Sequence, residues 1–171
     1  MPTNLLTPPI APASNDPSPA VRPQFWQRFA LAELNAAEWE ALCDGCGACC
    51  LIKLQDDDTG EVEYTDVACQ LLDCQTGACR HYPTRHRYVP DCIALDLNIL
   101  PTMDWLPATC AYKRLYRGLP LPDWHHLITG DRALSLRQMQ AANVSVAGRC
   151  VSETQVDEWE QEQRVIRWIK Q

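Results

Sequence analysis

Several features that are common in other protein classes are missing from this sequence. No uncharged apolar stretch reaches the length of about 18 residues that a membrane-spanning helix needs, so no such helix is expected. No Lys or Arg precedes Arg22, and prolines interrupt the apolar residues before it, so this segment is not expected to be a secretory signal. We therefore expect a cytoplasmic protein whose thiols stay reduced.

Motifs of the common enzyme classes are also absent. The chain has no nucleotide-binding glycine loop, no H-E-x-x-H motif and no recognisable Ser–His–Asp arrangement, which leaves hydrolase and dehydrogenase interpretations without support. Basic residues are outnumbered, because 15 Lys and Arg face 22 Asp and Glu, giving a net charge of −7. Nucleic acids and anionic membranes attract positively charged surfaces, so neither is expected as a partner.

Cysteine, in contrast, is abundant. The 171 residues include 10 cysteines but only 7 glycines and 3 methionines. The cysteine fraction is below that of disulfide-dense secreted miniproteins, and a chain of this length can bury a core without cross-links. A disulfide framework also conflicts with a reducing compartment. The cysteines therefore require another chemical explanation.

Four of the cysteines form a dense motif, C-x-x-C-x-x-C-C, made of Cys43, Cys46, Cys49 and Cys50. Two-residue spacing lets successive thiolates converge on one metal, and the intervening glycines let the backbone curl around it. Thiolates are soft ligands that select zinc, iron–sulfur clusters or copper(I). Because adjacent side chains diverge, Cys49 and Cys50 are not both expected to bind one ion, and a second site is plausible.

The composition divides the chain into two parts. Residues 1–23 hold seven of the 13 prolines and are predicted to be a disordered proline-rich extension. Residues 24–171 are predicted to be a cysteine-cluster metal-binding domain. We expect an α+β fold, mostly helical and irregular, in one small domain organised around one or two cysteine-ligated metal centres.

Local signals predict four elements of this fold. A capping box at Asn35–Glu38 predicts a short helix that leads to Cys43. Residues 61–65 are predicted to be extended, and Pro107 favours a helix over residues 108–117. Apolar residues at helical spacing after Ser152 predict a C-terminal amphipathic helix.

These motifs resemble the YcgN/YkgJ-like cysteine-cluster family of uncharacterised bacterial proteins, whose members are described as zinc- or iron-chelating. The resemblance extends from about residue 24 to the C-terminus. It is carried by the cysteine motif with Cys69, by the segments 79–85 and 105–112, by Phe25-Trp-Gln27, and by Leu121-Pro-Asp-Trp-His125.

The resemblance implies metal ligation by eight cysteines: Cys43, Cys46, Cys49, Cys50, Cys69, Cys79, Cys92 and Cys110. His125 belongs to a Trp-His pair that matches the family pattern, so it is a further candidate ligand. Cys74 and Cys150 are additional to the family set, and we interpret them as small buried hydrophobic residues.

Four functional hypotheses follow. An iron–sulfur cluster, or iron, is weakly favoured as the cofactor because the compact glycine-containing motif resembles ferredoxin loops. Zinc in a structural role is the alternative. A metal-dependent adapter could instead bind a protein partner through the basic segment Arg80–Arg87. A more distant similarity of the cluster alone to flagellin lysine N-methylases implies a methyltransferase-like enzyme as a further alternative, and no catalytic residue is assigned.

Overall fold

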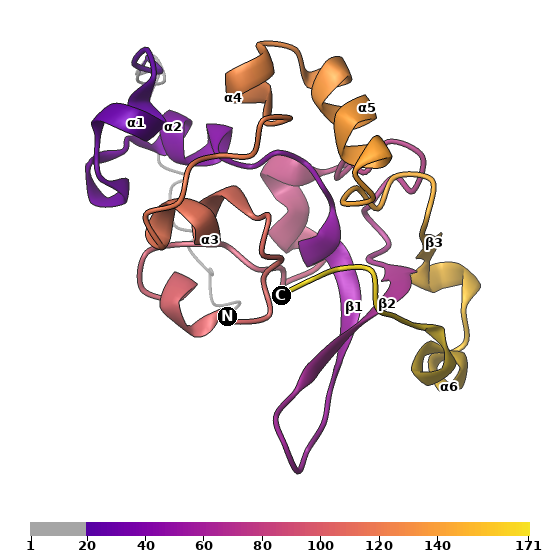
Figure 1. Cartoon of the computed structure of the whole chain (residues 1–171). Helices are drawn as coiled ribbons and strands as arrows, with labels where there is room; N and C mark the ends of the chain where they lie inside the picture. Colours follow the sequence, from indigo (N-terminus) through magenta and orange to yellow (C-terminus); the bar gives the residue numbers. More distant parts are fainter. Residues whose placement is uncertain (1–19) are drawn as a thin grey trace, which may run out of the picture.

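The computed structural model describes residues 20–171 (Figure 1). Six short α-helices are present in this part of the chain: α1 (Phe25–Arg28), α2 (Ala36–Ala41), α3 (Ala111–Tyr116), α4 (His126–Thr129), α5 (Arg132–Ala141) and α6 (Glu158–Gln161). Turns of 3-10 helix and irregular segments connect them. The fold is therefore α+β with much irregular chain, as predicted. None of the helices in this part is long and apolar enough to cross a membrane.

A small mixed sheet of four strands adjoins these helices. Strands β1 (Leu51–Gln55) and β2 (Val62–Ala68) form an antiparallel hairpin whose acidic turn projects away from the body of the molecule (Figure 1). Strand β3 (Val151–Ser152) pairs with β2 in parallel, and β4 (Val165–Ile166) pairs with it antiparallel. β2 is thus the central strand, and its extended conformation confirms the prediction for residues 61–65.

Two hydrophobic clusters form the core, and the cysteine motif runs between them. The first contains seven buried residues: Phe25, Leu42, Leu100, Leu106, Ala111, Tyr112 and Leu121. The second contains six: Ala48, Leu51, Tyr64, Ala68, Leu72 and Val146. Cys43 packs against the first cluster and Cys46 against the second, so the motif joins the two cores.

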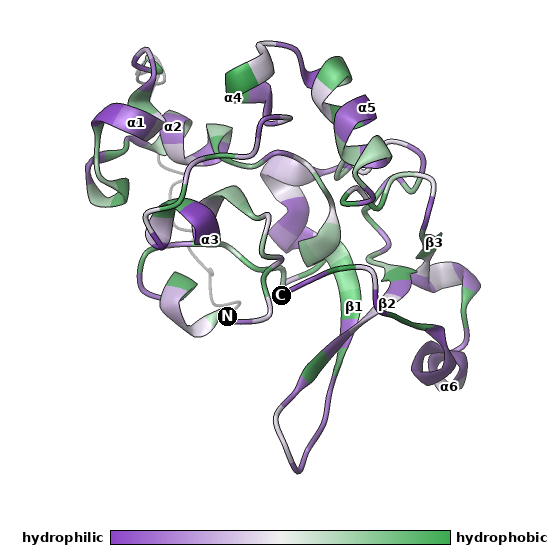
Figure 2. Cartoon of the chain, viewed as in Figure 1, coloured by the Kyte–Doolittle hydropathy of each residue, from purple (hydrophilic) through white to green (hydrophobic). Residues whose placement is uncertain are grey.

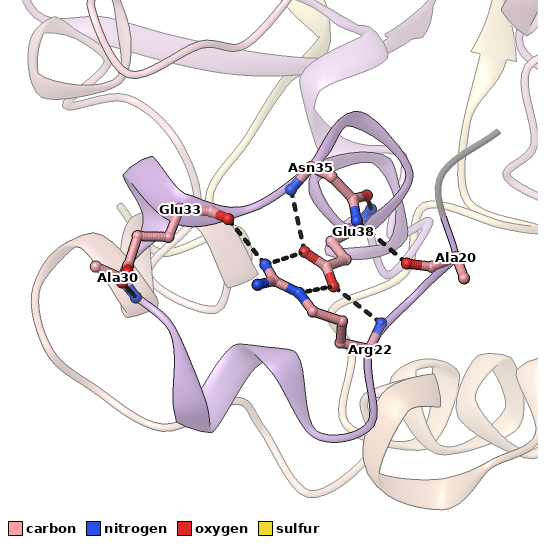
Figure 3. A network of polar contacts seen from close by, with 6 residues as sticks. All are labelled: Ala20, Arg22, Ala30, Glu33, Asn35 and Glu38. Carbon is pink, nitrogen blue, oxygen red and sulfur yellow. Dashed lines mark hydrogen bonds and ion pairs between the residues drawn. The ribbon is translucent and has the colours of Figure 1, made fainter. Parts of the chain in front are cut away.

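Helix α2 begins at the predicted capping box. The Asn35 side chain accepts a hydrogen bond of 3.0 Å from the Glu38 amide, and the Glu38 carboxylate accepts one of 3.0 Å from the Asn35 amide. Figure 3 shows that Glu38 also receives the Arg22 guanidinium, with Nη2 at 2.7 Å from Oε2 and Nε at 2.8 Å from Oε1. The prediction of a helix leading to Cys43 is therefore confirmed.

The predicted N-terminal extension lies outside the described residues except for residues 20–23. Within these, the Arg22 guanidinium forms a bidentate ion pair with the buried carboxylate of Glu38. Its guanidinium also lies 3.6 Å from the centre of the Phe29 ring. Arg22 thus connects the start of the described chain to α2.

Of the predicted helix over residues 108–117, only Ala111–Tyr116 is helical, as α3. The Ala108 amide donates to the Lys170 carbonyl at 2.7 Å, which commits the residues after Pro107 to a contact with the C-terminal segment. Helical structure then begins after Cys110 and ends before Gly118, whose φ of 70° stops the helix.

The predicted C-terminal amphipathic helix is wrong. The segment after Ser152 forms a 3-10 turn, the single turn of α6, another 3-10 turn and β4. Apart from the exposed Trp159, the residues of α6 are hydrophilic (Figure 2). Two β-branched residues, Val165 and Ile166, pair instead with Thr65 and Tyr64 of β2. Between Trp159 and Ile166 the helical pattern also lacks an apolar residue at positions 162 and 163, so a continuous apolar face could not form.

Candidate metal centre

The backbone of the cysteine motif turns sharply at two glycines. Gly45 and Gly47 have φ values of 80° and 79°, a left-handed conformation that side chains disfavour. A Cβ atom on Gly47 would overlap the Cγ2 atom of Val146, whereas one on Gly45 would meet nothing within 4 Å. The motif therefore passes from α2 into a 3-10 turn at Ala48–Cys50 and directly into β1.

Six cysteines line one cavity of about 280 Å³: Cys43, Cys49, Cys50, Cys69, Cys79 and Cys92. Three come from the motif, and the other three come from the chain that follows β2. Apolar side chains, including Ile52, Leu71 and Val89, make up much of the remaining wall. The fold thus gathers thiols from nearly fifty residues of sequence around a single hollow.

Main-chain hydrogen bonds hold the dispersed cysteines beside the motif. The Cys69 amide donates to the Cys50 carbonyl at 2.8 Å, at the point where β1 and β2 meet. Cys79 pairs with Leu72 in an isolated antiparallel bridge, which folds the segment after β2 back on itself. The Cys92 amide closes a turn on the Val89 carbonyl at 3.1 Å.

Cys46 and Cys110, the other two cysteines of the predicted set, do not line the cavity. Cys110 precedes α3 and packs against the first core cluster together with Cys43. Burial, followed by the charges of Asp44 and Cys49, raises the pKa of the Cys110 thiol to about 11. Burial also raises the pKa of Cys46, with Asp44 and Cys49 again adding to the effect. The charge of Cys49 therefore influences both thiols.

The charges of other cysteines influence the second cysteine of the doublet, Cys50. The pKa of Cys50 is raised because its thiol donates a hydrogen bond to Cys49, because it is buried, and because Cys69 and Cys79 are near. Burial raises the pKa of Cys69, and the charges of Cys92 and Cys79 contribute. Adjacent cysteines of the doublet therefore face different sets of neighbours.

Cys49 has the lowest pKa of the four motif cysteines. The hydrogen bond from Cys50 and the ammonium group of Lys53 lower its pKa to about 7. Lys53 is held in place because its Nζ atom donates to the carbonyl oxygens of Cys49 (2.9 Å) and Leu51 (2.7 Å) and lies 4.4 Å from the Trp105 ring. The sequence analysis did not identify Lys53, although it is the one base between Asp44 and Asp73.

Asp44 places an unsatisfied carboxylate oxygen inside the motif. Its Oδ1 atom accepts the Cys46 amide at 3.0 Å, but its buried Oδ2 atom has no hydrogen-bond partner among the described residues. Burial raises the pKa of Asp44. A buried oxygen of this kind calls for a cation, a proton or a water molecule nearby. The sequence analysis missed Asp44, and its position between two motif cysteines was the available signal.

His125 serves the backbone rather than the cavity. Its Nε2 atom lies 2.9 Å from the Leu42 carbonyl and its Nδ1 atom accepts the Leu127 amide at 3.1 Å, so the ring is neutral with the proton on Nε2. Burial lowers the pKa of His125, which agrees with the neutral form. His126 similarly lies 3.2 Å from the Cys43 carbonyl. Both rings thus connect α4 to the main chain at Leu42 and Cys43, where the motif begins.

The thiols line a cavity and do not converge on a single position. In residues 20–171, no group of three or more His, Cys, Asp or Glu side chains is already placed to hold a single metal ion. All ten cysteines are free thiols. Donor chemistry fits a soft metal or a thiolate-bound cluster, because six thiols line the cavity against two carboxylates, those of Glu40 and Asp91.

Comparison with known proteins gives a consistent description of this region. Residues 42–111 match a family profile described as "Putative zinc- or iron-chelating domain", named CxxCxxCC. The chain is 52% identical over 136 residues to UPF0260 protein PMI1174 of Proteus mirabilis, an alignment covering 80% of this chain and 90% of that protein. It is 50% identical over 136 residues to UPF0260 protein YcgN of Salmonella newport, covering 80% and 86%. No solved structure matches.

Proposed function

This chain belongs to the UPF0260 family that includes the YcgN proteins, and we propose that it is a metal-binding protein that holds an iron–sulfur cluster through cysteine thiolates in the cavity. Iron–sulfur clusters are held mainly by cysteine thiolates. Such ligation needs reduced thiols, which favours a reducing compartment such as the cytoplasm.

The observation that carries this proposal is the arrangement of six cysteines around a cavity of about 280 Å³. A zinc ion draws four thiolates to about 2.3 Å from one centre and leaves no hollow between them. A cluster of several iron and sulfide atoms keeps its ligands farther apart. Thiols that surround a hollow without converging on one point therefore favour a cluster over a single ion.

Cationic side chains near the cavity would offset part of the negative charge of a thiolate-bound group, although Glu40 and Asp91 also line it. Lys53 lies close enough to Cys49 and Cys50 to influence their charge, and Arg85 lines the cavity beside Tyr82. Apolar residues exclude water from much of the remaining surface. Burial and hydrogen bonding around the sulfurs are the means by which a protein tunes the potential of such a cluster.

We further infer that the eight family cysteines serve two centres. The charge of Cys49 contributes to the raised pKa values of Cys43, Cys46 and Cys110. Cys69 and Cys79 instead influence Cys50, and Cys92 influences Cys69. The doublet would then contribute one ligand to each group of four. This division agrees with the divergence of adjacent side chains.

Zinc is the second candidate, because the matching family is described as zinc- or iron-chelating. Two groups of four thiolates would equally suit two structural zinc ions. In that case the thiols would have to move inward and the cavity would close. The two candidates therefore predict different metals and different volumes of the cavity once the metal is bound.

The test is to purify the protein without oxygen and to measure iron, zinc and acid-labile sulfide per chain together with the visible spectrum. We expect a brown protein with iron and sulfide in similar amounts. A colourless protein with stoichiometric zinc would establish the second candidate instead. A protein that binds neither metal after reconstitution would refute both.

Cysteine-to-serine variants extend this test to the ligands. Cys92→Ser and Cys110→Ser should each lose about half of the bound metal if the two groups are separate centres. Cys150→Ser is the matched control, because Cys150 lies outside the cavity and outside the family set. Complete loss of metal in both variants would argue against two independent centres, and equal loss in the control would refute the ligand assignment.

A further inference from the structure

Two cysteines lie apart from the cavity, in segments that a main-chain hydrogen bond joins. Cys74 follows β2 in the turn that leads to Cys79, and Cys150 immediately precedes β3. Neither lines the cavity, and both pack against the second core cluster. The sequence predicted both to be small buried hydrophobic residues, but both are half-exposed, and the segments that carry them are joined by their main chains.

The contact is supported by both side chains and main chain. Burial raises the pKa of the Cys150 thiol to about 12, and the neighbouring Cys74 thiol adds to this increase. The Gly148 amide donates to the Cys74 carbonyl at 2.7 Å, so the two backbones are also tied together. Both side chains are half-buried, which leaves the sulfurs within reach of a small reagent.

Local structure keeps Cys74 in position. The Asp73 side chain accepts the Gln75 amide at 2.8 Å, and the Asp73 carbonyl accepts the Gly77 amide at 2.7 Å. Next to Cys150 in the sequence, the Arg149 guanidinium lies 3.7 Å from the centre of the Trp168 ring. These contacts bring the two thiols together before any bond forms between them.

From this arrangement we propose that Cys74 and Cys150 are a modification site, at which a low-molecular-weight disulfide such as glutathione disulfide converts the two thiols into a reversible intramolecular disulfide. The proposal is independent of the metal assigned to the cavity, since neither cysteine belongs to the proposed ligand set.

The chemistry balances as two successive thiol–disulfide exchanges. The thiolate of Cys74 attacks one sulfur of the oxidant, whose S–S bond breaks and whose other half leaves as a thiolate. The sulfur of Cys150, after losing its proton, attacks the mixed disulfide and releases the second half of the oxidant. The two protons lost by the protein are taken up by the two released thiolates, and the protein gives up two electrons.

Oxidation would close a loop that contains half of the cavity wall. Residues 75–149 lie between the linked cysteines, and Cys79 and Cys92 lie within that segment. Cross-linking a loop of this length restricts the unfolded chain, and we expect the melting temperature to rise by roughly 10 °C. The bond would thereby couple the redox state of the surroundings to the rigidity of the metal-binding region.

The experiment treats the protein, isolated without oxygen, with glutathione disulfide, blocks the remaining thiols and maps linked peptides without reduction. We expect a peptide pair joined through Cys74 and Cys150, removed by dithiothreitol. In Cys150→Ser we expect one glutathione adduct on Cys74 instead, and Cys74→Ser should give the mirror result on Cys150.

Linkage among cavity cysteines in place of the Cys74–Cys150 pair, or failure of the pair to form, would overturn the proposal. Metal content is measured in the same samples. A protein without metal that still forms the Cys74–Cys150 bond would refute the proposed function alone. Equal metal loss in Cys74→Ser and Cys92→Ser would refute the proposal, because Cys74 would then be a ligand.

Discussion

At the scale of single residues, neighbouring charges and hydrogen bonds determine the ionisation of a side chain more than its residue type does. Glu38 is fully buried yet ionised, because the Arg22 guanidinium donates to both of its carboxylate oxygens. Cys49 and Cys43 have the same side chain and belong to the same motif, but their surroundings give their pKa values of about 7 and about 12. Each difference leads to a measurable consequence.

Substitution of Glu38 by Gln should destabilise the protein in a pH-dependent manner. The hydrogen bonds from Arg22 lower the pKa of Glu38 to about 2, below the usual value of about 4.3. The ionised carboxylate therefore stabilises the fold fully above about pH 4.5, and this stabilisation is lost as the pH falls towards 2. Thermal unfolding should show a large difference between wild type and variant at pH 7 and a small one at pH 2.

The matched control for this prediction is Glu33→Gln. Glu33 is exposed and its carboxylate accepts only the Ala30 amide, at 2.8 Å, so the change should cost no more than about 0.5 kcal/mol. A difference between Glu38→Gln and wild type that is the same at both pH values would contradict the assignment of the effect to the ionised pair.

In metal-free protein, Cys49 should react first with iodoacetamide. The thiolate is the reactive form, and at pH 7 about half of Cys49 is ionised because of the hydrogen bond from Cys50 and the charge of Lys53. The Cys43 thiol, with its pKa near 12, stays protonated. We expect alkylation of Cys49 to be roughly a hundredfold faster, as measured by peptide mass spectrometry.

Lys53→Met keeps the length of the side chain but removes its charge, so it should slow alkylation of Cys49 at pH 7. Lys170→Met, which removes a charge at the C-terminus, should have no effect. Equal reaction rates at Cys43 and Cys49 would show that the proposed ionisation is wrong.

At the scale of elements, local sequence signals were sufficient to predict a helix or strand where its contacts are made between residues close in sequence. The capping box before α2 and the extended residues of β2 are such cases. The C-terminal helix failed because β4 depends on a distant partner, with Ile166 opposite Tyr64. Periodicity within the last twenty residues contains no information about that partner.

The two glycines of the motif should differ in their tolerance of alanine. Both have positive φ, so each substitution should cost about 1–2 kcal/mol in backbone strain. At Gly47 the new Cβ would also overlap Val146, which should raise the total to about 3–4 kcal/mol. Urea unfolding of Gly45→Ala and Gly47→Ala would measure both values.

Relief of the overlap provides the control for this pair. Val146→Ala on the Gly47→Ala background should be less harmful than the two separate changes added together, because the smaller side chain makes room. Equal destabilisation by Gly45→Ala and Gly47→Ala would show that contact with Val146 does not constrain the motif.

At the scale of the whole molecule, the cavity is the feature that sequence could not predict. The motif could be identified from its spacing, and the set of eight cysteines from resemblance to the family. Which of them meet depends on the pairing of β1 with β2 and on the reversal of the chain at Leu72 and Cys79. The contact between Cys74 and Cys150 arises in the same way, because β3 returns to β2 more than eighty residues later.

Removal of the metal should weaken the whole fold. The motif joins the two core clusters, so ligation by its thiolates would connect both of them. Because binding to the folded state adds to folding free energy, anaerobic chelation should lower the melting temperature by about 10 °C or more. Differential scanning calorimetry before and after chelation measures the change, and an unchanged transition in demonstrably metal-free protein would contradict it.

The most direct test of the central claim is X-ray absorption at the iron edge of wild-type protein isolated without oxygen. The proposed cluster predicts a first shell made of sulfur alone and a second shell of iron around each iron. A first shell dominated by oxygen or nitrogen, or sulfur ligation without iron–iron scattering, would contradict a thiolate-bound cluster in this cavity.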